Sequence, residues 1–175
     1  MKKIITIFCF LVIGTSAFAQ VDQYSKDVKK CIKSNGTYSY YEGVIEQMYT
    51  MLEEQFVAQK VPATVWADLK KGNSEAMDEL SLMIVSAYKA HFTHEDVKNM
   101  NKLYATKAGK NMFKTDALTE GDKVFLKEFY QSETGQKIVS SQESMNSSMS
   151  DISVMWSGNL YKSVISKLSE KGYDL

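Results

Sequence analysis

The chain has 175 residues, and its 21 cationic side chains, all lysine, balance 21 acidic ones. A neutral chain without arginine lacks the clustered, bidentate cations that nucleic-acid binding favours, so we expect no nucleic-acid partner. The length is that of one domain. No sequence pattern indicates a bound cofactor, and we expect none.

Residues 1–19 follow the order of a secretory signal peptide. Lys2 and Lys3 precede the apolar run 4–13, and small residues end at Ala19. We therefore predict cleavage after Ala19, which leaves 20–175 as a single helical domain in the periplasm of a Gram-negative bacterium. The apolar run is shorter than the ~20 residues that span a bilayer. No later stretch is apolar for long enough, so we expect no transmembrane segment.

After cleavage the chain would keep one cysteine, Cys31, in a compartment that oxidises thiols. It stands on a helix expected to end near Gly36. An internal disulfide is then impossible, and two interpretations stay open. Cys31 is either an inert, partly buried thiol or a free thiol that reacts or links two chains, helped by lysines that favour the thiolate.

Apolar side chains return at intervals of three and four through most of the chain, which predicts amphipathic helices. The clearest stripe lies between Tyr41 and Phe56. Pro62 predicts the start of a short helix that Gly72 ends, and Ser74 is expected to cap the next one. Alternating strand patterns between hairpin turns are missing. The sequence therefore predicts an all-α helical bundle.

The chain contains an internal repeat. THED at 93–96 recurs as TEGD at 119–122, twenty-six residues later, and the match extends over units at about 92–113 and 118–139. A threonine followed three residues later by an acid resembles a capping box. Thr93 and Thr119 are therefore predicted helix starts, so that each unit is a pair of helices.

Each unit also places a glycine early in its second helix, Gly109 in one and Gly135 in the other. Glycine in a helix interior costs about 1 kcal/mol against alanine. A repeated, costly glycine indicates close backbone packing. We expect Tyr104 and Tyr130, each at the end of the preceding helix, to cover these glycines.

The second unit continues without proline into a predicted long helix at about 132–170. Its apolar residues fall mostly three or four apart, so one stripe can line a bundle. The polar face is rich in serine. Because glycine and serine lower helix propensity, a kink or break near Gly158 is one alternative.

The chain resembles the bacterial family catalogued as domain of unknown function 2059, over roughly Leu80 to Leu168. Two motifs carry the resemblance, Phe92-Thr93-His94-Glu95-Asp96 and Phe129-Tyr130-Gln131-Ser132-Glu133-Thr134-Gly135-Gln136-Lys137. Members often have proline after the serine of the second motif, where this chain has glutamate. The resemblance implies an exported helical protein. It brings no established activity and no catalytic residue.

The best candidates for metal binding are His91 and His94, the only histidines, which have carboxylates beside them. Zinc needs three or four convergent ligands, and the helical interpretation puts these two on different helices. Adjacent methionines are interpreted as core rather than as copper ligands. No nucleophile elbow, phosphate-binding glycine loop or His-Glu-x-x-His motif occurs.

The leading hypothesis is therefore a non-catalytic binding or interaction module of the cell envelope. It would bind a protein, an envelope component or an apolar ligand in a groove between the repeat units and the long helix. The groove residues are predicted to be Tyr104, Gly109, Tyr130, Gly135 and Trp156. The alternative is a metal- or small-molecule-dependent activity at the two histidines. A homodimer through the long helix or the cysteine is a third hypothesis.

Overall fold

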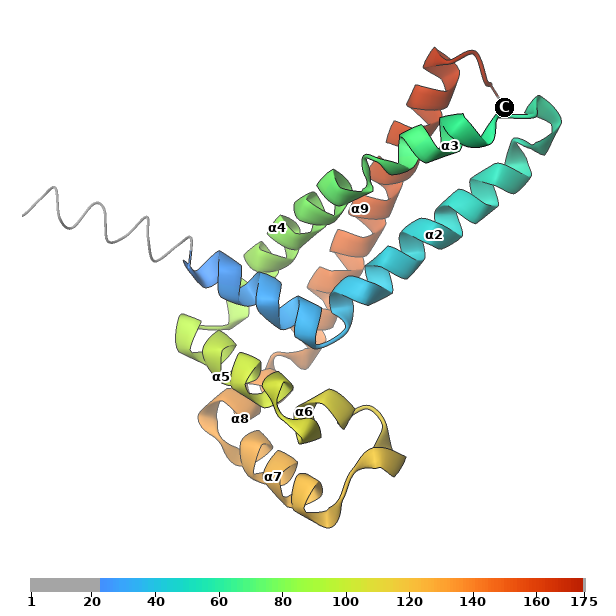
Figure 1. Cartoon of the computed structure of the whole chain (residues 1–175). Coiled ribbons are helices and arrows are strands. Elements are labelled where there is room, and N and C mark those ends of the chain that lie inside the picture. The colour runs from blue at the N-terminus through green and yellow to red at the C-terminus, as the bar shows by residue number, and fades with distance from the viewer. Residues whose placement is uncertain (1–22, 175) are drawn as a thin grey trace, which may run out of the picture.

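The structure, a computed structural model, describes residues 23–174 apart from the side chain of Thr115. The predicted signal peptide lies outside the described residues. Within them the chain is helical and contains no strand, which confirms the predicted all-α bundle with a long C-terminal helix (Figure 1). None of the described helices is both long enough and apolar enough to span a membrane.

Residues 23–34 are helical, and short connections separate most of the elements that follow. In chain order these are α2 (Thr37–Gln55), the 3-10 turn η1 (Val57–Gln59), α3 (Ala63–Lys70), α4 (Asn73–His91), α5 (His94–Ala105), α6 (Lys107–Asn111), the 3-10 turn η2 (Thr115–Ala117), α7 (Glu120–Gln131), α8 (Glu133–Ser140) and α9 (Gln142–Glu170). In Figure 1, α2, α4 and α9 run side by side as the main bundle. The short helices α5 to α8 extend beyond one end of it.

The core of the bundle comes from the apolar stripes of three helices. Those stripes repeat every three or four residues, which is the spacing that returns a side chain to the same face of a helix. Their buried members are Tyr41, Ile45, Tyr49 and Leu52 on α2, Met77, Leu80 and Ile84 on α4, and Ile152, Trp156, Val164 and Leu168 on α9. Each fully buried aliphatic side chain stabilises the fold by about 1.5–3 kcal/mol.

Glycine and proline mark where the first helices begin. Gly36 has φ 86°, a left-handed conformation that favours glycine, and α2 begins at the next residue. Pro62 directly precedes α3, as predicted. The expectation that Ser74 caps α4 is wrong, because α4 already begins at Asn73 after Gly72.

The predicted single helix over 132–170 is two helices. α8 ends at Ser140 and α9 begins at Gln142, so the long helix starts later than predicted. The Ser140 hydroxyl donates to the carbonyl of Lys137 at 3.1 Å. Serine side chains compete in this way with backbone hydrogen bonds and weaken a helix. The alternative of a break at Gly158 is wrong, since that residue lies inside α9.

The capping boxes of the repeat are both present. Thr93 Oγ1 accepts the backbone N–H of Asp96 at 3.3 Å, and the Asp96 carboxylate accepts the N–H of Thr93 at 2.9 Å. Thr119 and Asp122 make the same pair at 3.2 and 2.9 Å. These reciprocal bonds satisfy backbone donors that a helix start otherwise leaves free. The sequence repeat is therefore a structural repeat of two helix pairs, α5–α6 and α7–α8.

The repeated glycines allow each second helix to touch the end of the first. A Cβ atom built on Gly109 would lie 2.0 Å from the carbonyl oxygen of Leu103, and one on Gly135 would lie 2.2 Å from that of Phe129. These distances confirm the predicted close packing. The nearest atoms belong to the backbone, however, and not to the rings of Tyr104 and Tyr130. Any side chain larger than hydrogen would push the two helices apart.

Candidate functional site

The structure separates the residues that were predicted to form one groove. Gly109 and Gly135 are buried against the preceding helices of their own units, and Tyr104 and Tyr130 belong to the ends of α5 and α7. Trp156 instead lies in the main bundle, where it lines two hollows, one on each side of α9. None of the four repeat residues lines either hollow. Trp156 is therefore the starting point for the site.

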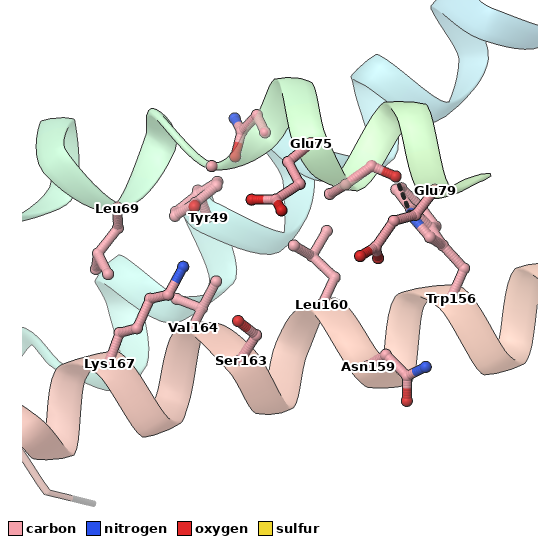
Figure 2. A pocket seen from close by; sticks show the side chains of 13 residues that line it. Tyr49, Leu69, Glu75, Glu79, Trp156, Asn159, Leu160, Ser163, Val164 and Lys167 are labelled. Atoms are coloured by element: carbon pink, nitrogen blue, oxygen red, sulfur yellow. Dashed lines mark hydrogen bonds between the residues drawn. The ribbon is translucent and has the colours of Figure 1, made fainter. Parts of the chain in front are cut away.

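Trp156 is held in a fixed position between α4 and α2. Its side chain is 1% exposed, and its indole N–H donates to the carbonyl of Ala76 at 2.8 Å, the dashed line in Figure 2. On the other side its ring meets the ring of Tyr41 edge to face, with centroids 5.3 Å apart. Buried indole N–H groups normally find such a partner. The ring is thus a rigid wall that both hollows share.

The first hollow, here named the polar pocket, has a volume of about 270 Å³ and lies between α4 and α9. In Figure 2, Glu75 and Glu79 extend from α4 toward α9, and Lys167 extends from α9 farther along the same space. No ion pair joins these three side chains to each other or to another residue that the structure describes. The Oδ1 atom of Asn73, which also lines the pocket, is buried without a hydrogen-bond partner. The acidic side chains are exposed at the surface.

The second hollow, here named the apolar groove, has a volume of about 540 Å³ and lies between α2 and α9. Most of the side chains around it are apolar or aromatic. Its lining consists of Val44, Gln47, Met48, Met51, Trp156, Ser157, Gly158, Leu160, Tyr161 and Lys162. A volume of this size is typical of small-molecule sites, which are mainly apolar with a few polar groups. The groove is the larger of the two hollows and the less polar in its lining.

Gly158 opens the groove. A Cβ atom built there would have no heavy atom within 4 Å, apart from its own helix and neighbours. The glycine therefore leaves empty space on the α9 side, opposite Met48 and Met51 of α2. Lys162 is one turn farther along α9 and is the only charged side chain among the described residues that line the groove. The groove can thus receive an apolar chain with one cation beside it.

The polar side chains that line the groove are Gln47, Ser157, Tyr161 and Lys162. Nucleophilic catalysis needs a nucleophile beside a base, and neither histidine nor cysteine lines the groove. Among the residues that the structure describes, no three His, Cys, Asp or Glu side chains are placed to hold a metal ion.

His91 and His94 do not converge on a common ligand position with a third donor. His94 Nε2 lies 2.7 Å from Asp27 Oδ2, which joins α5 to the helical residues 23–34. Burial raises the pKa of Asp27, but hydrogen bonds from His94 and Gln23 outweigh burial, so the pKa lies below its usual value. His91 contacts the ring of Phe92 instead. The structure thus gives His94 a structural partner.

Cys31 belongs to the core. Its side chain is fully buried, and its Sγ lies 3.9 Å from the hydroxyl of Tyr88. Burial raises the pKa of the thiol to about 12, so the thiol stays protonated at neutral pH. Of the two interpretations of this cysteine, the geometry favours the inert thiol.

Sequence reasoning missed a buried polar network between the repeat units. Asp96, the capping acid of α5, is only 5% exposed and accepts a hydrogen bond from Thr134 of α8 at 3.0 Å. Lys137 of α8 forms an ion pair with the same carboxylate, and Asn99 donates to Thr134 at 3.2 Å. Burial raises the pKa of Asp96, but hydrogen bonds from Lys137, Thr93 and Thr134 lower it to about 2. The sequence predicted the capping role of Asp96. It did not predict the partners of Asp96 on α8, which are thirty-eight or more residues away.

Comparison with known proteins gave no matching family model, no matching curated protein and no matching solved structure. The resemblance to the family of unknown function 2059 therefore stays a prediction. The class of protein that the structure itself defines is an all-helical bundle with an appended pair of helical repeats and an apolar groove beside Trp156.

Proposed function

We propose that this protein is a non-catalytic binding module that holds the apolar chain of an anionic amphiphile, such as a fatty-acid-like carboxylate, between α2 and α9. One observation carries the proposal. The groove of about 540 Å³ beside Trp156 is lined mainly by apolar side chains and has one charged neighbour, Lys162. Burying apolar ligand surface there contributes roughly 25 cal/mol per Å².

The side chains on the α2 side suit a flexible ligand chain. Met48 and Met51 are unbranched and polarisable, and methionine adapts its shape to irregular apolar partners. Met51 is 42% exposed, so part of its apolar surface is available to a ligand. Lys162 supplies one cation at the rim of the groove. A single anionic head with an apolar tail therefore matches the groove better than a polar or cationic molecule.

The proposed site of action is the periplasm. The basic pair, apolar run and Ala17-Phe18-Ala19 ending are typical of a cleaved signal peptide, and this pattern supports export. Amphiphiles with apolar chains are abundant at membranes, and a binding module beside the envelope would meet them there. The predicted compartment and the apolar lining of the groove therefore support the same class of ligand.

The test is direct binding of a dansyl-labelled fatty acid, followed by its own fluorescence and by tryptophan emission. Met51→Glu puts a charge into the groove, and Gly158→Leu fills the space that the glycine leaves open. We expect each to weaken binding at least about tenfold, which is ~1.4 kcal/mol. The matched control is Leu82→Glu, because Leu82 is a 55% exposed apolar residue on α4 that lines neither hollow.

A second comparison tests the role of the cation. Lys162→Gln should weaken binding of the fatty acid but leave binding of the corresponding uncharged alcohol nearly unchanged. If the probe does not bind the unmodified protein, or binds Gly158→Leu and Leu82→Glu equally well, the groove is not the binding site and the proposed function is wrong.

A further inference from the structure

The polar pocket contains charged side chains that have no partner in the described part of the chain. Glu75 and Glu79 stand four residues apart on α4, which places them on the same face of that helix, and Lys167 lines the pocket from α9 (Figure 2). None of the three forms an ion pair with a residue that the structure describes. Like charges at this spacing destabilise a helix. The two carboxylates therefore lack a compensating cation.

Another pair of acids in the same bundle has such a cation. Glu46 and Glu53 lie seven residues apart on α2, and Lys70 of α3 lies 3.7 Å from each of their carboxylates. Lys167 lines the same pocket as the two α4 glutamates and forms no ion pair with either. The pocket thus keeps two anionic groups and one cationic group apart, which is the arrangement that a ligand with charges of both signs requires.

A buried acceptor lines the same space. Asn73 is the first residue of α4, and its Oδ1 atom is buried without a hydrogen-bond partner among the described residues. Buried polar atoms are nearly always paired, and an unpaired one destabilises the fold. An amide oxygen and an ionised carboxylate accept hydrogen bonds and cannot donate them. The α4 side of the pocket therefore suits a ligand that donates, above all an ammonium group.

The remaining lining limits the size and form of the ligand. The volume of about 270 Å³ is just below the roughly 300–1,000 Å³ of pockets that hold drug-sized molecules. Leu69, Leu160, Val164 and the ring of Trp156 provide apolar surface beside the charged groups. A short methylene chain can lie against this surface. The pocket therefore fits a small ligand whose charged groups are joined by an apolar chain.

We propose that the polar pocket is a second binding site, which holds a basic amino acid with its two ammonium groups beside Glu75 and Glu79 and its carboxylate beside Lys167. The pocket carries two negative charges and one positive charge, and a basic amino acid carries the reverse. Hydrogen bonds between ionised groups are about twice as strong as those between neutral groups. Asn73 Oδ1 can accept a further bond from an ammonium group. A bare metal ion is a poorer match, because Lys167 repels it.

The test is isothermal titration calorimetry of the purified protein with L-lysine at neutral pH and low ionic strength. We expect saturable binding at one site with a dissociation constant of about 1 mM or lower. L-norleucine has the same carbon chain without the terminal ammonium group, and 1,5-diaminopentane lacks the carboxylate. Each should bind at least about tenfold more weakly than L-lysine, because each leaves one charged group of the pocket without its partner.

Three variants assign the charges to the two ends of the ligand. Glu75→Gln and Glu79→Gln should each weaken L-lysine binding at least about tenfold, and Lys167→Gln should weaken it while leaving binding of 1,5-diaminopentane no weaker than before. The matched control is Glu54→Gln, the same change at an exposed residue of α2 that does not line the pocket, and it should leave binding intact. An unchanged melting temperature confirms that each variant is folded.

The binding is independent of the amphiphile in the apolar groove, because none of the charged side chains of the pocket lines the groove. Absence of saturable L-lysine binding to the unmodified protein would overturn the inference. So would L-norleucine binding as tightly as L-lysine, since the second carboxylate would then recognise nothing. Equal losses of affinity in Glu54→Gln and in the pocket variants would also overturn it, because the effect would then come from overall charge and not from the pocket.

Discussion

Replacing each of three glycines by alanine should change the stability of the fold, with opposite signs at different positions. Alanine at Gly158 adds a Cβ atom into open space and replaces the poorest ordinary helix former by the best, so it should stabilise the fold by about 1 kcal/mol. Alanine at Gly109 meets the carbonyl oxygen of Leu103 at 2.0 Å, and at Gly135 it meets that of Phe129 at 2.2 Å. Both distances are far inside van der Waals contact.

The cost at the two repeat glycines can be estimated. Overpacking costs about 1–3 kcal/mol when a side chain can move aside. Here the obstacle is backbone, so the upper value of about 3 kcal/mol applies, and about 1 kcal/mol of gained helix propensity offsets it. The net loss is about 2 kcal/mol. In a chain of this length each kcal/mol shifts the melting temperature by about 2–4 °C.

Thermal unfolding followed by circular dichroism should therefore melt Gly109→Ala and Gly135→Ala about 4–8 °C below the unmodified protein, and Gly158→Ala about 2–4 °C above it. Urea unfolding at fixed temperature gives the free energies independently. Because the same glycine-to-alanine change is made at all three helical positions, a difference in stability between the variants must come from the surroundings of each glycine. If Gly109→Ala is as stable as the unmodified protein, the close approach of α5 and α6 is not real and the reasoning fails.

Three further predictions concern other parts of the chain. Cys31 should not react with a thiol reagent at neutral pH until denaturant unfolds the protein, because it is buried with a pKa raised to about 12, and prompt labelling would contradict this. The folded pKa of Asp96 lies below its unfolded value of 3.8, at about 2, so its contribution is complete above about pH 5 and is lost as pH falls from there through about 2. That contribution is roughly 2 kcal/mol, and Asp96→Asn should flatten the pH dependence of the urea midpoint in this window. Finally, the protein recovered from the periplasm should have the mass of residues 20–175, and a retained residue 1–19 segment would contradict cleavage after Ala19.

The parts of the fold that the sequence predicted are those that local chemistry determines. The capping boxes at Thr93 and Thr119 involve only residues three positions apart. Gly109 and Gly135 indicate a close approach of two helices, because glycine destabilises a helix and is otherwise unfavourable at these positions. The apolar stripes of α2, α4 and α9 follow in the same way from helical periodicity. The break at Ser141 was not predicted because a serine-rich stretch lowers helix propensity at many positions. The sequence does not show at which of them the helix ends.

The candidate site was harder to predict because it depends on pairing between distant segments. Trp156 was among the predicted groove residues, but nothing local shows that its indole N–H reaches Ala76 or that α9 packs beside Met51 of α2. The predicted groove was placed between the repeat units and the long helix for lack of that information. The partnership of Asp96 with Lys137 was invisible for the same reason, since each residue has an ordinary local role at a helix start or on a helix face.

The two proposed sites share one wall, and this makes their independence a separate test. Trp156 lines both the polar pocket and the apolar groove, and its ring is held by the carbonyl of Ala76 and the ring of Tyr41. A ligand on one side affects the other only if that wall moves. Glu75→Gln should therefore weaken L-lysine binding and leave the affinity for the dansyl-labelled fatty acid unchanged, and Gly158→Leu should do the reverse. If saturating L-lysine changes the affinity for the fatty acid, the fatty acid must change the affinity for L-lysine by the same factor, and Trp156 is then a moving element that couples the two sites rather than a rigid wall.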